Sequence, residues 1–240
     1  MSIFSTFDNY FQLARCAAKL VRDFKHMTFE EAHPRRAACA NEMLEALKVT
    51  YDVENRDGLR IGRPCIYVAN HTAMIDSVVM CAVLPYDVRF LAKKELFSVP
   101  LLKRVLRLEK HIPVFRGKEA KAHIDDLKKS IAEAFAEGAS CLIFPEGTRS
   151  LTGEMGPFKL GAFYNAVQNN VPIVPVALEG LFAINPKTRK AITPGHAVVH
   201  VLAPIEVPDG TDEHDRAQKL ADLAKQAIAD AQARQRHAVQ

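Results

Sequence analysis

The chain has 240 residues, of which 48% are hydrophobic and 25% are charged. That length and composition suit one large α/β domain, alone or with a small appendage, and supply enough apolar side chains for a core. The formal net charge of +4 is too small to indicate a nucleic-acid-binding protein, although it permits attraction to an anionic membrane or an acidic carrier.

The cysteines and the N-terminus bear on the cellular compartment. The five cysteines form no CxxC pair, and Cys65, Cys81 and Cys141 lie in apolar runs, so we expect reduced cysteines and a cytoplasmic protein. Asp8 and Asn9 interrupt the first apolar residues, which is not the layout of a signal peptide. No stretch reaches the roughly 18 apolar residues of a membrane-spanning helix, so we expect any membrane association to be peripheral.

Two helices are expected at the start of the chain. Apolar residues recur with helical spacing over 3–24, and basic residues accumulate toward its end. This pattern fits either a helix packed on the domain or an amphipathic helix lying in a bilayer interface. The second helix spans 28–48, with Thr28 as its cap and with its regular part beginning near Pro34.

Short apolar runs then alternate with helical stretches. The expected strands are 65–69, 88–91, 112–115, 140–144, 172–178 and 197–202. The expected helices are 76–84, 95–108, 118–137, 158–169 and 212–236. The alternation predicts a central, mostly parallel or mixed sheet flanked by helices. We therefore divide the chain into an amphipathic two-helix motif at 1–48 and an α/β domain at 49–240. Two prolines interrupt strand 172–178, which we expect at a sheet edge or a bulge.

His71 and Asp76 follow the apolar run CIYVA and are five residues apart. Side chains five apart on one continuous helix diverge by roughly 140°. The two therefore meet only if His71 lies on a loop and Asp76 in the first turn of the next helix. A carboxylate that holds one imidazole nitrogen leaves the other as a general base for a hydroxyl. The alternative is a surface histidine beside a helix-capping aspartate.

The run FPEGTRS follows the apolar stretch CLI and begins at the last residue of the expected strand at 140–144. Its proline and Gly147 predict a turn that exposes Glu146, Thr148 and Arg149 together. The planar, permanently charged Arg149 suits a phosphate, Thr148 can add a hydroxyl donor, and Gly147 lets backbone N–H groups approach a ligand. Glu146 cannot bind phosphate, so we expect it to orient Arg149, a backbone group or a substrate hydroxyl. The alternative is a structural turn with an internal Glu–Arg pair.

Two further cations follow expected strands. Lys93 comes after 88–91 and Arg116 after 112–115, where both could join Arg149 around a phosphate. Each alone is more typical of ordinary surface charge. The remaining histidines show no paired-ligand spacing, so we expect no metal site.

These runs in this order resemble the glycerolipid acyltransferase family, of the 1-acyl-sn-glycerol-3-phosphate acyltransferase (lysophosphatidic acid acyltransferase) type. NHTAMID is similar to the family's H-x4-D block, and KKEL and IPVFR are similar to the second block and the segment before it. FPEGTRS matches the third block and VPIVPVAL the fourth. The resemblance covers residues 65–180. H-x4-D alone is a weak signal, whereas FPEGTRS downstream of it is specific.

The resemblance implies that His71 is the catalytic base and Asp76 its partner. It places at the acceptor site Lys93, Arg116, Glu146, Gly147, Thr148 and Arg149. It also implies an activity: transfer of an acyl group from acyl-CoA or acyl carrier protein, with no cofactor, to the free hydroxyl of 1-acyl-glycerol-3-phosphate, giving phosphatidic acid for phospholipids. Such enzymes are membrane-associated, so we expect peripheral attachment to the cytoplasmic face of the inner membrane, with 1–48 in the bilayer surface. Apart from the resemblance, the apolar and irregular strand 172–178 could help line an acyl-chain groove, and the alternative is an ordinary core strand.

The chain departs from the family pattern at two places. Many members have serine two residues after the histidine, where this chain has Ala73, so a hydrogen bond near the base is expected to be absent. The second block often has glycine before the strand and aspartate before the arginine, where this chain has His111 and Phe115 in those regions. The identity of the lipid that accepts the acyl group is therefore left open. The alternatives are acylation of another lyso-lipid, such as a lyso-ornithine lipid, and a non-catalytic peripheral lipid-binding protein.

Overall fold

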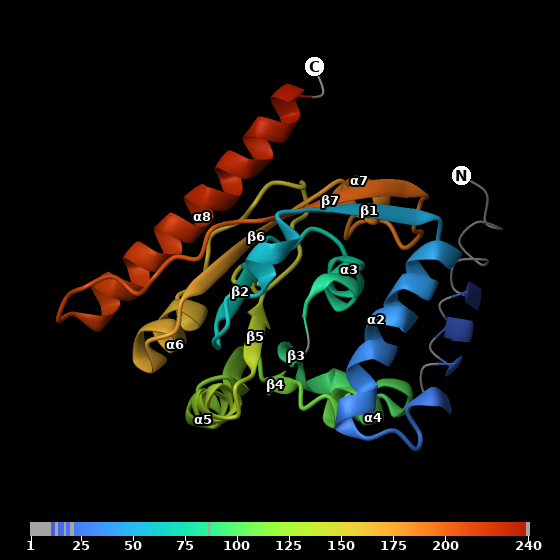
Figure 1. Cartoon of the computed structure of the whole chain (residues 1–240), viewed down its shortest axis with the longest axis horizontal. Helices are drawn as coiled ribbons and strands as arrows, with labels where there is room; N and C mark the ends of the chain where they lie inside the picture. The colour runs from blue at the N-terminus through green and yellow to red at the C-terminus, as the bar shows by residue number, and fades with distance from the viewer. Residues whose placement is uncertain (1–10, 13, 17, 20–21, 86, 239–240) are drawn as a thin grey trace.

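The computed structural model describes residues 11–238 except 13, 17, 20, 21 and 86. A seven-stranded sheet lies between helices on its two faces (Figure 1). The strands are β1 (Val49–Glu54), β2 (Ile66–Ala69), β3 (Val88–Lys93), β4 (Ile112–Val114), β5 (Ser140–Ile143), β6 (Ile173–Glu179) and β7 (Gly195–Val201). The α-helices are α2 (Phe29–Ala46), α3 (Asp76–Val83), α4 (Pro100–Leu108), α5 (Ile124–Ala136), α6 (Gly161–Asn169), α7 (Leu181–Ile184) and α8 (Glu213–Ala238). Short 3₁₀ helices are η1 (Arg56–Leu59), η2 (Lys94–Ser98) and η3 (Gly117–Glu119).

The strand order is β1-β7-β6-β2-β5-β3-β4. Every neighbouring pair is parallel except β6 and β7, which are antiparallel. The predicted α/β fold with a mostly parallel sheet is therefore confirmed. Because β2, β5, β3 and β4 run the same way, the loops that follow them emerge at one edge of the sheet, where open α/β folds place their ligands.

Each face of the sheet has its own core. Successive side chains of a strand point to opposite faces, and β2 is buried along its whole length. Tyr67 packs on one face in a cluster that includes Leu44 of α2 and Met80 of α3. Ile66 packs on the other face with Phe163 of α6 and with residues of α8. Figure 1 shows the same division, with α2 and α3 on one side and α5, α6 and α8 on the other.

Most expected elements are present with small shifts at their ends, but one strand was missed and two expected helices are divided. Strand β1 was not anticipated, although buried or half-buried side chains alternate with exposed ones along it, as at an outer strand. The helix expected at 95–108 is divided into η2 and α4, because Pro100 starts a new helix and the preceding Val99 is extended. Similarly, 118–137 is divided into η3 and α5.

The proline-containing strand β6 is an inner strand, so the expected edge position is wrong. The alternative expectation, a bulge, is present, with the extra residue on the opposite segment that follows β7. Four residue steps separate Val201 from Ile205, but only three separate their partners Val176 and Ile173. Pro175, which has no N–H to donate, lies between these pairs, where the ladder is interrupted. Since β6 is buried from Ile173 to Leu178, it contributes to the core, which was the alternative to a groove lining.

Helix α2 begins earlier than Pro34 had suggested. Thr28 and Glu31 form a capping box, in which the Thr28 N–H donates to Glu31 Oε2 at 2.8 Å, and the helix runs from Phe29 through Pro34 to Ala46. The reciprocal cap satisfies the first turn, so the proline lies inside the helix. Leu44 on the inner side of α2 and Leu47 at its C-cap both join the main core.

The segment before α2 packs beside it. The described residues between 11 and 23 are helical, and Lys19 and Arg35 both pair with Glu42. Phe24 is fully buried against Val105 of α4. Residues 1–10, the start of the expected interfacial helix, lie outside the described part. Among the described helices, none combines the length and apolar character needed to cross a bilayer. The division at 48/49 and the bilayer role of the motif stay predictions.

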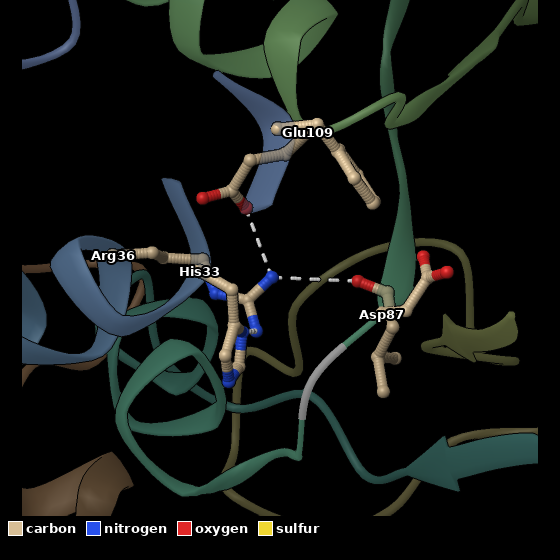
Figure 2. A pocket seen from close by; sticks show the side chains of 6 residues that line it. His33, Arg36, Asp87 and Glu109 are labelled. Carbon is tan, nitrogen blue, oxygen red and sulfur yellow. Dashed lines mark hydrogen bonds and ion pairs between the residues drawn. The ribbon is translucent and has the colours of Figure 1, made fainter. Parts of the chain in front are cut away.

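A buried ion pair joins α2 to the sheet domain. Arg36 Nη1 donates to Glu109 Oε2 at 2.9 Å, and Figure 2 shows the guanidinium between Glu109 and the start of β3. Both side chains are nearly inaccessible to solvent. Burial raises the pKa of Glu109 to about 7 against the opposing effect of Arg36. Arg36 also donates to His33 Nδ1 at 2.8 Å, and burial followed by the Arg36 charge lowers the pKa of His33 to about 4.

His111 adds a pH-dependent term to the stability of this region. Its Nδ1 accepts the Phe90 N–H at 3.2 Å, and burial, with smaller contributions from Arg36 and Arg89, lowers its pKa from 6.5 to about 3. Between these values the unfolded chain binds a proton that the folded chain does not, so folding is favoured as pH rises and disfavoured as pH falls. Glu109, whose pKa is raised, acts in the opposite sense between 4.5 and about 7.

We predict that His111→Asn weakens the acid sensitivity of the fold. Asparagine can still accept the Phe90 N–H but does not titrate. Relative to the variant, the wild-type free energy of unfolding should fall by about 1.4 kcal/mol for each unit of pH between 6.5 and about 3. Urea unfolding of both proteins at a series of pH values measures this, and parallel pH dependences would contradict it.

Candidate active site

The candidate site lies on the loops that follow β2 and β5. These strands are adjacent and parallel, with Val68 paired to Ile143. His71 and Glu146 each stand three residues beyond that pair, so the register brings the two sequence runs side by side. This placement agrees with the sequence prediction that the loops act together.

His71 and Asp76 form the pair that the sequence predicted. His71 lies on the loop and Asp76 is the first residue of α3. Their Nδ1 and Oδ2 atoms are 2.8 Å apart, and the same Oδ2 accepts the backbone N–H groups of Thr72 at 2.7 Å and Ala73 at 2.9 Å. Asp76 is fully buried, whereas 18% of the His71 side chain is exposed. A carboxylate that accepts three hydrogen bonds favours the tautomer with its proton on Nδ1.

The other ring nitrogen, Nε2, bonds no group in the described part of the chain. The imidazole stacks on Phe144, with ring centroids 4.2 Å apart and planes inclined by 21°. The ring is thus held by Asp76 at one nitrogen and by Phe144 on one face. Nε2 is left as an acceptor for a proton from outside the protein, which is the arrangement of a general base.

Glu146 holds the backbone of the histidine loop. Its Oε1 accepts the His71 N–H at 2.7 Å, and its Oε2 accepts the Gly156 N–H at 3.0 Å. The His71 carbonyl in turn accepts the Ser150 N–H at 2.8 Å. Of the three roles expected for Glu146, orientation of a backbone group is the one that the structure contains. The Glu146 side chain is buried. Its participation in binding the lipid that accepts the acyl group stays a prediction.

The turn after β5 presents Thr148 and Arg149. Gly147 adopts φ +70°, which favours glycine, and a β-carbon there would lie 2.8 Å from Lys159 Nζ. Its own N–H donates to the Phe144 carbonyl at 3.0 Å, so this group is engaged within the turn. Arg149 is half-buried, and its guanidinium has no hydrogen-bond or ion-pair partner among the described residues. The internal Glu–Arg pair considered from sequence is therefore not formed.

Lys93 and Arg116 lie at the same sheet edge but farther from His71. Lys93 ends β3 and is paired with Val114, two residues before Arg116. Strands are about 4.8 Å apart, so β3 and β4 stand about 10 and 14 Å from β2. Both side chains are exposed. Lys94, beside Lys93, lies 5.2 Å from the centre of the Phe115 ring. Participation of Lys93 and Arg116 in acceptor binding stays a prediction.

Sequence reasoning missed three polar side chains around the site. Asn70 is buried and exchanges two hydrogen bonds with the backbone of Leu178, which ties the end of β2 to β6. Asn185 accepts the Met74 N–H at 3.2 Å, and Lys187 Nζ donates to Thr148 Oγ1 at 3.0 Å. Asn70 immediately precedes His71, which was an available signal, whereas residues 185 and 187 belong to a distant segment without a motif.

Comparison with known proteins shows the family of the chain. The acyltransferase family model matches residues 50–179, which is more than half of the chain and includes every expected site residue. The chain belongs to the acyltransferase family. The resemblance inferred from the four sequence runs is thereby confirmed.

Several relatives of this acyltransferase-family chain carry a common name. A chloroplastic 1-acyl-sn-glycerol-3-phosphate acyltransferase of Brassica napus is 35% identical over 139 residues, or 58% of this chain and 39% of that protein. The human 1-acyl-sn-glycerol-3-phosphate acyltransferase beta is 33% identical over 183 residues, or 72% of this chain and 65% of that protein. The chain thus spans about half the length of many curated relatives it matches.

A solved structure confirms the fold. The 1-acyl-sn-glycerophosphate acyltransferase of Thermotoga maritima superposes with a TM-score of 0.77 and covers 95% of this chain and 96% of its own. The two sequences are only 20% identical. The likeness therefore concerns the arrangement of helices and strands.

Ala73 marks the departure from the family's usual block. It is fully buried and its backbone N–H still reaches Asp76. Its methyl group offers no hydroxyl, and the second oxygen of Asp76, Oδ1, is buried without a partner within the described residues. The carboxylate is therefore held entirely through one oxygen, by the backbone and by His71.

We predict that Glu146→Gln loosens the histidine loop. The amide keeps one oxygen, so either His71 or Gly156 loses the acceptor of its N–H. Leaving a buried donor unpaired costs about 1–3 kcal/mol. Urea unfolding should show a loss of that size, and amide hydrogen exchange at His71 or Gly156 should accelerate. An unchanged free energy of unfolding together with unchanged amide exchange would contradict the role of Glu146 as acceptor of both N–H groups.

Proposed function

We propose that this chain transfers a fatty acyl group from a thioester to the free hydroxyl of 1-acyl-glycerol-3-phosphate, giving phosphatidic acid. The family and the names of the relatives support an acyl transfer of this kind. The observation that carries the proposal is the geometry of His71. Its Nδ1 is held by buried Asp76, its Nε2 is open, and the unpaired guanidinium of Arg149 stands on the adjoining turn.

The acceptor's phosphate would bind Arg149. A guanidinium forms two parallel hydrogen bonds with a phosphate, and this one is not neutralised by a carboxylate. The Ser150 N–H that follows it is bonded to the His71 carbonyl, so the anion site and the base share a short backbone link. Binding the phosphate there would hold the hydroxyl near the base, which lowers the entropic part of the barrier. Lys93, Arg116 and Thr148 would add donors to the same phosphate.

His71 would act twice in the reaction. Nε2 takes the proton of the acceptor hydroxyl as the oxygen attacks the thioester carbonyl. The tetrahedral intermediate then collapses, the carbon–sulfur bond breaks, and the imidazolium returns the proton to the leaving thiolate. The products are an ester and a free thiol, and no acyl-enzyme or cofactor is needed. Because the Gly147 N–H is engaged in its turn, the backbone N–H groups of Thr148 and Arg149 are the better candidates to stabilise the oxyanion.

The donor would be acyl-CoA or an acyl carrier protein. Both present the acyl group as a thioester, so the proposed chemistry is the same for either. Because the acceptor is a membrane lipid, we place the protein peripherally at the cytoplasmic face of the inner membrane. The N-terminal motif would then contact the bilayer surface.

We predict that His71→Ala abolishes thioester-dependent acylation of lysophosphatidic acid while the protein still folds. Loss of a general base lowers turnover by about 10²- to 10⁴-fold. Release of free thiol from acyl-CoA and from acyl carrier protein measures turnover, and urea unfolding reports the fold. His214→Ala, an exposed histidine on α8, is the matched control and should retain full activity.

A panel of acceptor lipids distinguishes the proposed reaction from acylation of another lyso-lipid and from lipid binding without catalysis. Wild-type protein should prefer lysophosphatidic acid to monoacylglycerol, which lacks the phosphate, and to a lyso-ornithine lipid. Preference for the ornithine lipid would replace the proposed acceptor but keep the chemistry. Substantial turnover by His71→Ala would refute the base, and absence of transfer to every acceptor would leave a lipid-binding protein.

A further inference from the structure

Two large apolar side chains are exposed on the loops that carry the candidate site. Met74, three residues after His71, is 48% exposed, and Leu151, two residues after Arg149, is 62% exposed. Leu151 is the most exposed large apolar side chain in the described part of the chain. Single exposed apolar side chains are common on protein surfaces, but these two lie on hydrogen-bonded loops at one site, and the site chemistry does not require either side chain.

Backbone hydrogen bonds fix the two loops that carry these side chains. Met74 donates its N–H to Asn185, and the bond from the Ser150 N–H to the His71 carbonyl joins the two loops. Ser150 Oγ also accepts the N–H groups of Thr152 at 3.3 Å and Gly153 at 3.0 Å. Leu151 therefore occupies the tip of a structured turn, beside the loop that carries Met74.

The charged side chains around this tip are mostly cationic. The loops 147–154 and 185–190 carry four cations, of which Lys187 and Lys190 are exposed and Arg149 and Arg189 are half-buried. The Arg189 guanidinium donates to the backbone carbonyls of Ala183 and Ile184, so it contributes charge to this surface while held by the fold. Against them stands one exposed carboxylate, Glu154. The acids of the site itself, Asp76 and Glu146, are buried and bonded to the backbone. An apolar tip with a cationic surround is complementary to a bilayer that contains anionic lipid, because apolar groups enter between head groups whose phosphates attract the cations.

We propose that Met74, Leu151 and the surrounding cations form a docking surface for an anionic lipid bilayer at the mouth of the site. The inference rests on the proposed function in one respect, that the acceptor is a lipid whose phosphate reaches Arg149. A lipid can present its phosphate there while its tail stays in the bilayer only if the bilayer lies against these loops. This contact is separate from any made by residues 1–48.

The first test does not depend on turnover. The chain has no tryptophan, so Leu151→Trp introduces a single indole at the tip. Its fluorescence should shift to the blue and be quenched by vesicles of phosphatidylglycerol with brominated phosphatidylcholine, and less by vesicles without phosphatidylglycerol. Leu223→Trp, at an exposed site on α8, is the matched control and should be quenched little. Equal quenching of the two indoles would overturn the proposal, as would a blue shift of the Leu151→Trp protein without vesicles as its concentration rises, which indicates contact between copies.

The second test uses activity. Leu151→Glu should lower kcat/KM about tenfold on lysophosphatidic acid in anionic vesicles and leave it within about twofold on a short-chain acceptor dispersed as monomers. Leu223→Glu should change neither value. Equal losses on both acceptors would show that Leu151 contacts substrate rather than bilayer, and no loss on vesicles would also overturn the proposal. If no acceptor is acylated by the wild type, the proposed function fails, and the quenching result still decides the docking surface.

Discussion

The candidate site depends on one hydrogen-bonded carboxylate oxygen. Asp76 Oδ2 accepts from the His71 ring and from two successive backbone N–H groups, inside a fully buried first turn of α3. The negative charge is stabilised by the helix N-terminus and by these donors. This single acceptor sets both the conformation of the loop and the tautomer of the ring. Removal of the carboxylate would leave the Thr72 and Ala73 amides without an acceptor as well as release the imidazole.

The sheet order brings the remaining parts of the site to that pair. β2 lies between β6 and β5, which come much later in the chain, so the loop after β2 is flanked by segments remote in sequence. The loop after β5 supplies Phe144, Glu146 and Arg149. The segment after β6 supplies Lys187. Asn70 ties the same loop to β6. The His71 backbone is therefore held at both its N–H and its carbonyl, which keeps the base in place before substrate arrives.

Local patterns predicted the parts of the site, and non-local packing decided their partners. The angle argument for positions 71 and 76 depends only on helix geometry, and it led to the correct loop-and-helix placement. By contrast, the sequence left three possible roles open for Glu146. The N–H groups that its carboxylate binds are brought together by strand pairing, which no local pattern shows. The expectations drawn from prolines were right only in part: Pro34 does not delay the start of α2, and Pro175 lies in an inner strand opposite a bulge. The Thr28 cap was visible in the sequence, but its reciprocal bond with Glu31 was not weighed against Pro34. The extra residue opposite Pro175 lies in a segment remote from that proline, so no local pattern could show it.

The tautomer of His71 tests this account most directly. Nitrogen-15 NMR of the imidazole side chain at neutral pH distinguishes a protonated Nδ1 from a protonated Nε2. Because Asp76 Oδ2 lies 2.8 Å from Nδ1 and also accepts two amides, we predict the proton on Nδ1 and an unprotonated Nε2. A His71 ring with its proton on Nε2, or a mixture typical of a free histidine, would contradict the assignment of His71 as the base.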